Sequence, residues 1–430
     1  MALTGRAALL ALLAVLPVAL APGGVVLAVL GVLLLAGIAV DVALAGAVSS
    51  LELSRSGDVS CRLGDTAAVQ LSLVNRGPRR VRGLVRDAWV PSAGARTTVQ
   101  PVDVPAGERR VLTTDLAPTR RGDRTPDRVT VRSVGPLGIA ARQGRHEVPW
   151  RVRVQPPFTS RRFLPERLSR LRQLDGLVAA RARGQGTEFD ALRDYVDGDD
   201  VRSIDWRASA RRTEVVVRTW RPERDRQLLL VLDTGRTSAG RVGDAPRLDA
   251  ALDAALLLAA LASRAGDRVD LLAMDRVVRA AVEGASAAEL MGRISDVAAG
   301  LEPALVEVDG RRMVAEVLRR CRRRSLVVLF TSLETAAVEQ GLLPVLASLV
   351  RRHTVLVAAV ADPRVASLAS GRGGVEEVYA AAAAEQSLSE RRRLTALLRR
   401  RGVEVVDAPP ASLAPAVADA YLALKSAGRL

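Results

Sequence analysis

Lysine, histidine, cysteine and aromatic residues are all scarce in this 430-residue chain. Cys61 and Cys321 lie far apart, no CxxC pair occurs and the two histidines are isolated, so no cluster has the spacing of a zinc site. Aromatic residues make up 3 % and are not interleaved with the arginines, which argues against a platform that stacks nucleic-acid bases. A GxSxG elbow, a P-loop and an HExxH motif are also missing, so no common hydrolytic or nucleotide-binding chemistry is supported.

The charge of the chain is strongly basic. Basic residues outnumber acidic ones by 63 to 47, the net charge is +16, and Lys425 is the only lysine. Such an excess suits nucleic acid, an anionic membrane leaflet or an acidic partner. The shortage of aromatic residues favours the membrane, so we expect no nucleic-acid ligand. Direct nucleic-acid binding stays open as an alternative, and steeply salt-dependent DNA binding would reveal it.

Two apolar runs occupy the first fifty residues. Residues 7–21 are wholly apolar, and residues 25–48 carry Asp41 as their only charge. Roughly 20 residues cross a hydrocarbon core, so the first run is short for a span and the second is long enough. Pro22-Gly23-Gly24 places a tight turn between them. We interpret residues 1–50 as a transmembrane helical hairpin.

The flanking charges give this hairpin an orientation. Arg6 precedes it, Arg55 follows it and the turn has no basic residue, so both ends and the soluble domains should face the cytoplasm. The expected location is therefore the cell membrane, as a multi-pass protein. A secretory signal peptide is the alternative, because Ala19-Leu20-Ala21 resembles a cleavage site. Pro22 directly after that site and the second apolar run count against cleavage, which stays an open question.

The remaining chain divides into three regions by pattern. Residues 51–157 alternate apolar and polar side chains, with turns roughly every ten residues, which predicts a small β-sandwich. Residues 158–224 are polar and dense in charge. Residues 225–430 alternate uninterrupted apolar strands with helices, which predicts a doubly wound α/β domain with a parallel sheet covered on both faces. Ligands of such sheets bind at the carboxyl ends of the strands.

The individual elements of this α/β domain can also be placed. The expected strands are residues 228–232, 269–274, 277–282, 325–330, 354–360 and 403–406. The expected helices are residues 248–264, 287–299, 311–322, 337–351, 389–400 and 413–425.

Several motifs resemble known families. Asp233-Thr234-Gly235-Arg236-Thr237 resembles the DxSxS loop of von Willebrand factor type A domains, and Thr331-Ser332-Leu333-Glu334 stands where that fold has its Thr-Asp loop. Residues 184–218 resemble the signature of the bacterial domain-of-unknown-function-58 family, with Gly-x-Glu-Phe, Leu-Arg-x-Tyr, Gly-Asp-Asp-x-Arg-x-Ile-Asp-Trp and Ala-Ser-Ala-Arg. Gly135-Pro136-Leu137-Gly138-Ile139 is similar to that family's Asp-Pro-Phe-Gly-Leu turn, with Gly135 in place of Asp.

The resemblance covers nearly the whole chain, because the family also has two membrane helices, a β region and a type A domain. It implies no established catalytic activity. Family members are commonly encoded beside a MoxR-type AAA+ ATPase, and type A domains mainly bind proteins. The resemblance therefore implies a non-enzymatic, membrane-anchored interaction module, an accessory partner of such an ATPase in protein-complex assembly or cell-envelope maintenance.

Type A domains often bind through a divalent metal, and this chain retains few ligands for one. Asp233 and Thr237 are the only candidate ligands, since Gly235 has no side chain and Ser332 stands where a second carboxylate is expected. We therefore expect no bound metal and no cofactor, with Asp233 hydrogen bonding to the turn that follows it. Asp233, Thr237 and Ser332 remain candidates for contact with a partner at the strand ends.

The acidic signature offers a second set of candidates. Asp199, Asp200, Asp205 and Arg207 are expected to contact a partner. Hydrolysis by these clustered carboxylates is the enzymatic alternative. Neighbouring arginines lower carboxylate pKa values, however, and so favour a structural ion-pair network. Trp206 is expected to pack against the sheet.

Overall fold

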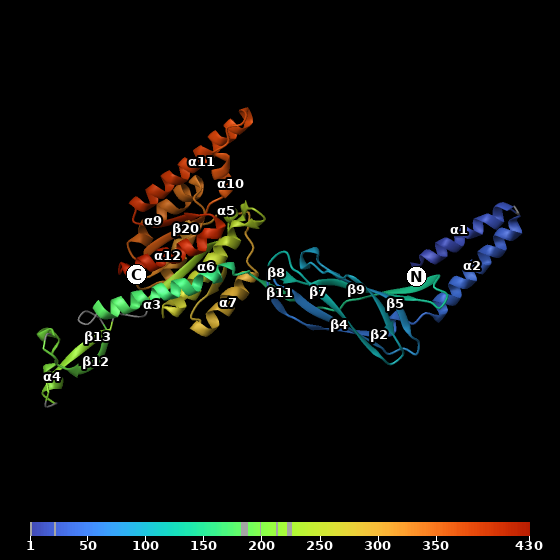
Figure 1. The fold of residues 1–430 in the computed structure, drawn as a ribbon, viewed down its shortest axis with the longest axis horizontal. Coiled ribbons are helices and arrows are strands. Elements are labelled where there is room, and N and C mark those ends of the chain that lie inside the picture. The colour runs from blue at the N-terminus through green and yellow to red at the C-terminus, as the bar shows by residue number, and fades with distance from the viewer. Residues whose placement is uncertain (1, 21–22, 182–187, 198, 212–213, 222–225) are drawn as a thin grey trace. The chain divides into compact units, whose positions relative to one another are not determined.

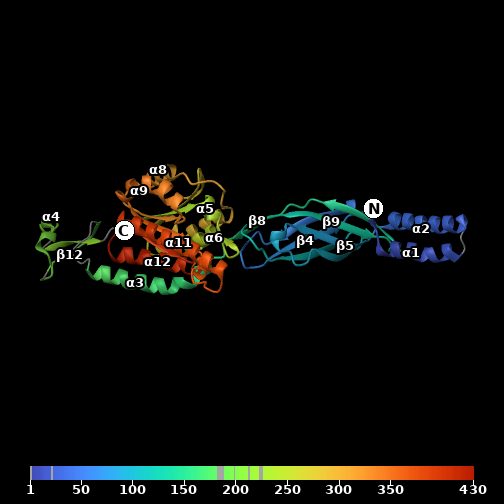
Figure 2. The same cartoon turned by 90° about the horizontal axis from the view of Figure 1, so that it is seen from above.

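The computed structural model describes residues 2–20, 23–181, 188–197, 199–211, 214–221 and 226–430. The chain divides into two compact units, Met1–Pro157 and Phe158–Leu430. Figures 1 and 2 show helices and antiparallel strands in the first unit, and a sheet packed between helices in the second.

The first unit begins with a short strand, β1 (Ala2–Leu3), followed by two apolar helices, α1 (Gly5–Leu20) and α2 (Gly24–Leu44). The two helices lie side by side (Figures 1 and 2). Within the described residues, α2 together with the turn after it is the one helix that is long and apolar enough to cross a membrane. With 16 residues, α1 is shorter than a typical span.

The β-strands of this unit form a sandwich. One antiparallel sheet has the order β2-β4-β7, and a second has the order β1-β10-β9-β5-β6; a third, smaller sheet is β3-β11-β8. Their bounds are β2 (Leu51–Gly57), β3 (Ser60–Arg62), β4 (Ala67–Asn75), β5 (Val81–Trp89), β6 (Val99–Val104), β7 (Arg109–Leu116), β8 (Gly122–Arg124), β9 (Pro126–Val134), β10 (Ala140–His146) and β11 (Val152–Gln155).

The core of the sandwich follows from the predicted alternation. Leu71 and Leu73 of β4 are buried against Val85 and Val131 of the opposite sheet, so the two sheets share one apolar core. Ser72 departs from the pattern because its hydroxyl, although buried, accepts a hydrogen bond from Arg109 at 2.7 Å.

A buried carboxylate joins α2 to this sandwich. Asp41 is fully buried, and its two oxygens accept hydrogen bonds from the backbone amides of Leu137 (2.6 Å), Ile139 (2.5 Å) and Ala140 (2.9 Å). Two of these amides belong to the Gly-Pro-Leu-Gly-Ile turn between β9 and β10, and Ala140 is the first residue of β10. Gly135 is required there, since a Cβ at this position would lie 2.5 Å from the carboxyl carbon of Asp41. The turn that resembles the family motif is therefore the attachment point of α2.

The second unit begins with a short 3-10 helix (Thr159–Phe163), which is followed by α3 (Leu164–Arg181), a β-hairpin and an α/β body. The hairpin pairs β12 (Glu188–Asp194) with β13 (Val216–Arg221), and α4 (Trp206–Ser209) lies between these strands in sequence. The body has a six-stranded sheet with the order β18-β17-β14-β19-β20-β21, parallel except for β18 at one edge. Its strands are β14 (Gln227–Asp233), β17 (Arg268–Met274), β18 (Val278–Val282), β19 (Leu326–Phe330), β20 (Thr354–Val360) and β21 (Glu404–Ala408).

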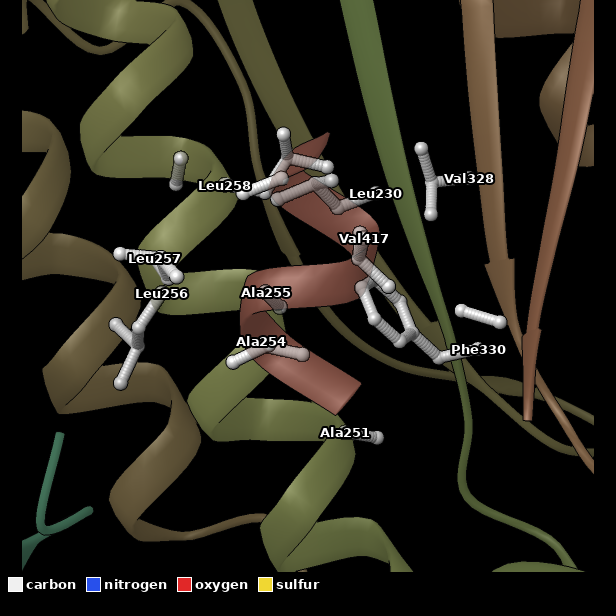
Figure 3. Close-up of a cluster of buried hydrophobic side chains, with 14 of the residues drawn as sticks. Leu230, Ala251, Ala254, Ala255, Leu256, Leu257, Leu258, Val328, Phe330 and Val417 are labelled. Atoms are coloured by element: carbon white, nitrogen blue, oxygen red, sulfur yellow. The ribbon is translucent and has the colours of Figure 1, made fainter. Parts of the chain in front are cut away.

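Helices cover both faces of this sheet because its strands are apolar on both sides. On one face Leu230 and Phe330 pack against α6 and α12, together with α7 and the start of α3 (Figure 3). On the other face Leu229 and Val231 pack against α8, α9 and α11. The bounds are α6 (Arg247–Arg264), α7 (Ala287–Ala299), α8 (Gly310–Arg320), α9 (Leu343–Val350), α11 (Val375–Arg400) and α12 (Pro410–Ser426).

Most predicted elements of this body are confirmed within a few residues, and three differ. The expected helix 337–351 is divided into a π-helical turn (Ala336–Leu342) and α9, where Pro344 lies in the first turn and cannot donate a backbone hydrogen bond. The expected helix 389–400 is the second half of α11, which begins at Val375. A short helix, α10 (Pro363–Leu368), was not predicted.

Candidate functional site

The first candidate site lies at the carboxyl end of the central strand. Asp233 is the last residue of β14, and the chain turns there into α5 (Arg236–Ala239). One carboxylate oxygen accepts the backbone amide of Gly235 at 2.7 Å; the other accepts the hydroxyls of Thr237 at 3.1 Å and Thr331 at 2.7 Å. Because Thr331 follows β19, this carboxylate links the loops of two adjacent strands. The predicted bond to the following turn is present, and Thr331 is the partner that the sequence did not indicate.

The surroundings of Asp233 disfavour the ionised form of its carboxyl group. Burial raises its pKa above the ordinary value, and the nearby Asp275 carboxylate raises it further, while hydrogen bonds from Thr331, Gly235 and Thr237 oppose this. All three donors are uncharged. A charged carboxylate in this position lowers the stability of the folded protein. Such a cost is more typical of functional loops than of residues that serve packing alone.

Asp275, which follows β17, is a second carboxylate in this cluster. Thr234 donates a hydrogen bond to it at 3.3 Å, and Arg279 donates one at 2.7 Å. Burial works against its charge, but the bonds from Arg279 and from the amide of Val277 outweigh that effect, so its pKa lies below the ordinary value. Its position directly after an apolar strand is the sequence signal that could have identified it.

The strand-end cluster presents little surface. Asp233, Thr237 and Ser332 are only 3 %, 5 % and 4 % exposed, and the Ser332 hydroxyl has no hydrogen-bond partner among the described residues. Exposed groups beside this cluster include Arg236 and Glu307, which form a surface ion pair at 2.7 Å. The three predicted residues therefore stabilise the loop from its interior. A direct contact with a partner is left to the exposed residues next to them.

The geometry at Gly235 bears on metal binding. Within the described ranges, no group of three or more His, Cys, Asp or Glu side chains is placed to hold a metal ion. A Cβ at Gly235 would lie 2.7 Å from the Val308 side chain and 2.8 Å from the Val306 carbonyl oxygen. The segment that contains these two valines thus lies where the middle serine of a DxSxS loop would need space.

Gly235→Ser is therefore expected to destabilise the protein rather than create a metal site. The clash involves backbone, so overpacking should lower the free energy of unfolding by about 1–3 kcal/mol. Gly292→Ser is the matched control, since a Cβ there has nothing within 4 Å. Thermal unfolding of both variants, with and without Mg²⁺, measures the effect. A Mg²⁺-dependent gain in stability for Gly235→Ser would contradict this expectation.

The second candidate site is the signature hairpin, where the acidic residues act as caps. Asp199 accepts hydrogen bonds from Arg193 and from the amide of Val196. Asp200 caps the short 3-10 turn Val201–Ser203 through the amide of Arg202 at 3.0 Å. Residues 184–187, the first part of the signature, lie outside the described residues.

Asp205 plays the same structural role at α4. It caps the helix through the amide of Ala208 at 3.0 Å and accepts Arg218 at 2.8 Å. The amide of Ala208 and then Arg218 hold its pKa below the ordinary value, and Arg193 does the same for Asp199. Lowered pKa values keep these carboxylates ionised and suit capping and ion pairing rather than proton transfer at neutral pH. Arg218 is the arginine whose side chain pairs with Asp205.

These caps position apolar side chains at the surface. Trp206 is the first residue of α4 and is 65 % exposed, so the prediction that it packs against the sheet is wrong. Val196 and Val201 are also exposed, at 61 % and 60 %. Large exposed apolar side chains clustered in one short stretch are typical of interaction surfaces. Arg207 is exposed beside Trp206.

Comparisons with known proteins agree with the signature. Residues 191–404 match the family described as Protein of unknown function DUF58. Uncharacterised proteins of Mycobacterium tuberculosis (strain H37Rv) and Mycobacterium bovis are each 30 % identical to this chain over 183 residues, which is 42 % of this chain and 57 % of theirs. The chain thus spans little more than half the length of these relatives.

Similarity to solved structures is weak. The CARDB domain of a Pyrococcus furiosus protein is 20 % identical with a TM-score of 0.19, covering 24 % of this chain and 86 % of that domain. A β-glucosidase from Listeria innocua is 17 % identical with a TM-score of 0.15, covering 23 % of this chain and 16 % of that enzyme. Similarities of this size carry no argument about function.

Proposed function

We propose that this protein is a non-enzymatic, membrane-anchored interaction module whose signature hairpin docks onto a cytoplasmic protein. The exposed Trp206, held on turns capped by Asp200 and Asp205, is the observation that carries the proposal. Aromatic anchors of this kind dominate the binding energy of many protein interfaces. In this proposal the acidic residues of the signature have an indirect role. Each cap fixes the backbone next to an exposed side chain.

The anchor is proposed to be a helical hairpin with both ends on the cytoplasmic side. β1, ahead of α1, pairs with β10 through Leu3 and Ala140, and Asp41 near the end of α2 bonds to the amide of the same Ala140. The two ends of the helix pair thus meet one strand, which supports a hairpin over a cleaved leader. Removal of the first segment at Ala21 would take away β1 and α1.

The α/β body is proposed to be a von Willebrand factor type A-like domain. The sheet order β18-β17-β14-β19-β20-β21, with an antiparallel edge strand, supports this assignment. So does the position of Asp233, at the end of the central strand and in contact with Thr331 of the neighbouring loop. In this proposal the domain carries the signature hairpin, and its buried polar cluster stiffens the strand-end loops.

A MoxR-type AAA+ ATPase is the partner that the family resemblance suggests. The resemblance is the only ground for this partner, and the exposure of Trp206 supports the signature hairpin as the surface where we expect it to dock. Co-purification of the full-length chain from native membranes tests the pairing directly. Recovery of the chain without any AAA+ ATPase would count against it.

Trp206→Ala is expected to weaken capture of the partner at least thirtyfold, the size of a hot spot of about 2 kcal/mol. Tyr379→Ala is the matched control, because Tyr379 is an aromatic residue of the same unit that is 75 % exposed on α11. Quantitative co-purification from membranes, with equal expression of each variant, measures the difference. Equal capture by both variants would remove the hairpin from the interface.

A further inference from the structure

A basic groove lies on the outer face of the larger sheet of the sandwich, at a distance in sequence from both sites described above. The strand register places Arg86 of β5 opposite Thr130 of β9, and Thr130 opposite Arg145 of β10. Arg132, two residues further along β9, lies opposite Gln143. Side chains from these three strands, together with Val99 of the adjacent β6, line a groove of about 430 Å³.

The charge of this groove is unbalanced. Four arginines line it, Arg86, Arg128, Arg132 and Arg145, against the single carboxylate of Asp127. Asp127 pairs with Arg128 at 2.9 Å, and Arg132 donates to the neutral side chain of Gln143. Among the residues that the structure describes, no carboxylate pairs with Arg86 or Arg145. Three guanidinium groups around a threonine hydroxyl can donate several hydrogen bonds to a phosphate group.

The groove also has an apolar side. Leu84 and Val99 line it, and both side chains are more than two-fifths exposed, at 42 % and 47 %. A ligand that combines an anionic group with an apolar portion therefore fits better than a purely ionic one. No aromatic side chain lines the groove, so it offers no surface on which a nucleic-acid base would stack.

Its position relative to α2 indicates where such a ligand would come from. Arg142 of β10 donates a hydrogen bond to the carbonyl of Val42, near the end of α2, at 2.7 Å. A second cavity, of about 600 Å³, is lined by Val42, Ser49 and Arg142, and shares Arg145 with the groove. The basic surface thus continues from the groove to the end of α2. If α2 spans a bilayer, this end lies at the level of the lipid headgroups.

We propose that this groove binds the phosphate headgroup of an anionic phospholipid. Arg86, Arg132 and Arg145 hold the phosphate, and Leu84 and Val99 contact the glycerol and the first acyl carbons. The proposal rests on the membrane anchoring proposed above. It adds a specific lipid contact that fixes how the sandwich faces the membrane surface.

Lipid titration of the full chain in an uncharged detergent tests this site. The double variant Arg86→Gln with Arg145→Gln should bind short-chain phosphatidylglycerol roughly thirtyfold more weakly than wild type, as expected for two basic residues at an anionic surface. The control is Arg76→Gln with Arg110→Gln, which changes net charge equally. These arginines belong to the β2-β4-β7 side of the sandwich and pair with Glu52 and Glu108 at exposed positions. The control variant should bind like wild type.

The other outcomes overturn the proposal. If both double variants weaken lipid binding equally, the lipid is attracted by the overall charge of the protein and not by a specific site. Equal affinity for phosphatidylcholine means that the groove does not select an anionic headgroup. Full competition by inorganic phosphate, an acidic peptide or an oligonucleotide at the same concentration means that a lipid is not the ligand. Alkaline extraction of native membranes tests the anchor separately. Release of the wild-type chain would refute the anchoring, whereas the titration in detergent reports on the groove alone.

Discussion

Asp41→Ala is expected to loosen the junction between α2 and the sandwich and to cost about 4 kcal/mol in stability. The substitution leaves three backbone amides, of Leu137, Ile139 and Ala140, without their acceptor. Hydrogen bonds to a charged group contribute about 1.5–3 kcal/mol each, and an unpaired buried amide costs about 1–3 kcal/mol. Partial rearrangement of the turn or entry of water keeps the total cost in stability below the sum of these separate contributions.

Hydrogen exchange of the full chain in detergent measures this effect at the turn itself. Amides of residues 137–140 should exchange about a thousandfold faster in Asp41→Ala if opening becomes easier by about 4 kcal/mol. Asp58→Ala is the control, since Asp58 accepts one exposed amide, that of Ala68, at 2.8 Å. Similar exchange at residues 137–140 in wild type and Asp41→Ala would show that the junction does not depend on this carboxylate.

A double substitution tests why this turn contains glycine. The family motif that the turn resembles has Asp at position 135, and an Asp there can bond to the amide two residues later. Gly135→Asp alone should be destabilising, because its Cβ would lie 2.5 Å from the Asp41 carboxyl carbon. Combined with Asp41→Ala, the contacts with the carboxyl group disappear and one acceptor returns, while the backbone carbonyl oxygen of residue 41 still lies 2.5 Å from the added Cβ. We expect a coupling of about 2 kcal/mol between the two positions, and strictly additive effects would contradict it.

The strands of the α/β body could be predicted because burial on both faces leaves a direct mark on the sequence. Residues 354–360 are an uninterrupted apolar run after one threonine, and β20 has the predicted bounds, Thr354–Val360. The start of α11 was missed for the opposite reason. Val375 and Tyr379 are exposed there, so no apolar face repeats at helical spacing.

The contacts that define the sites could not be predicted to the same degree. Asp233 was identified by the resemblance of its loop to a DxSxS motif, but Thr331 is 98 residues away in sequence, and their hydrogen bond depends on the sheet order. Asp41 was noted as the only charge in its apolar run, while the amides it binds lie about a hundred residues later. Trp206 was misplaced because an aromatic side chain in a polar segment gives no sign of which way it points.

Asp233→Ala and Asp233→Asn are expected to change stability in opposite directions. Alanine leaves the amide of Gly235 and the hydroxyls of Thr237 and Thr331 without an acceptor, which should cost about 3 kcal/mol. Asparagine keeps the volume and one acceptor while removing a buried charge, so the free energy of unfolding should rise by about 1 kcal/mol at neutral pH. Pulse proteolysis in urea, followed on fragments of the second unit, measures both. Asp244→Asn, at an exposed loop carboxylate, is the control.

The pH dependence of the same variants separates the charge of Asp233 from its packing. Burial raises the pKa of Asp233 in the folded protein above its value in the unfolded chain. The folded state then binds the proton more tightly, so this contribution to stability is complete below the unfolded pKa and is lost as the pH rises through the folded pKa. Wild type should therefore lose stability relative to Asp233→Asn across that interval, with a constant difference above it. A pH-independent difference would contradict the raised pKa.

Capture of the partner by Asp233→Asn then decides what the strand-end loop contributes to function. The side chain of Asp233 is 3 % exposed, so this residue can affect a partner only through the conformation of the loop that it stabilises. Asparagine preserves that loop, and capture should match wild type, whereas Asp233→Ala should reduce it. Loss of capture in Asp233→Asn, although its stability is not reduced, would mean that the carboxylate charge itself is needed. A cation that joins this chain to its partner would then be the simplest explanation, and Mg²⁺-dependent capture by wild type would test it.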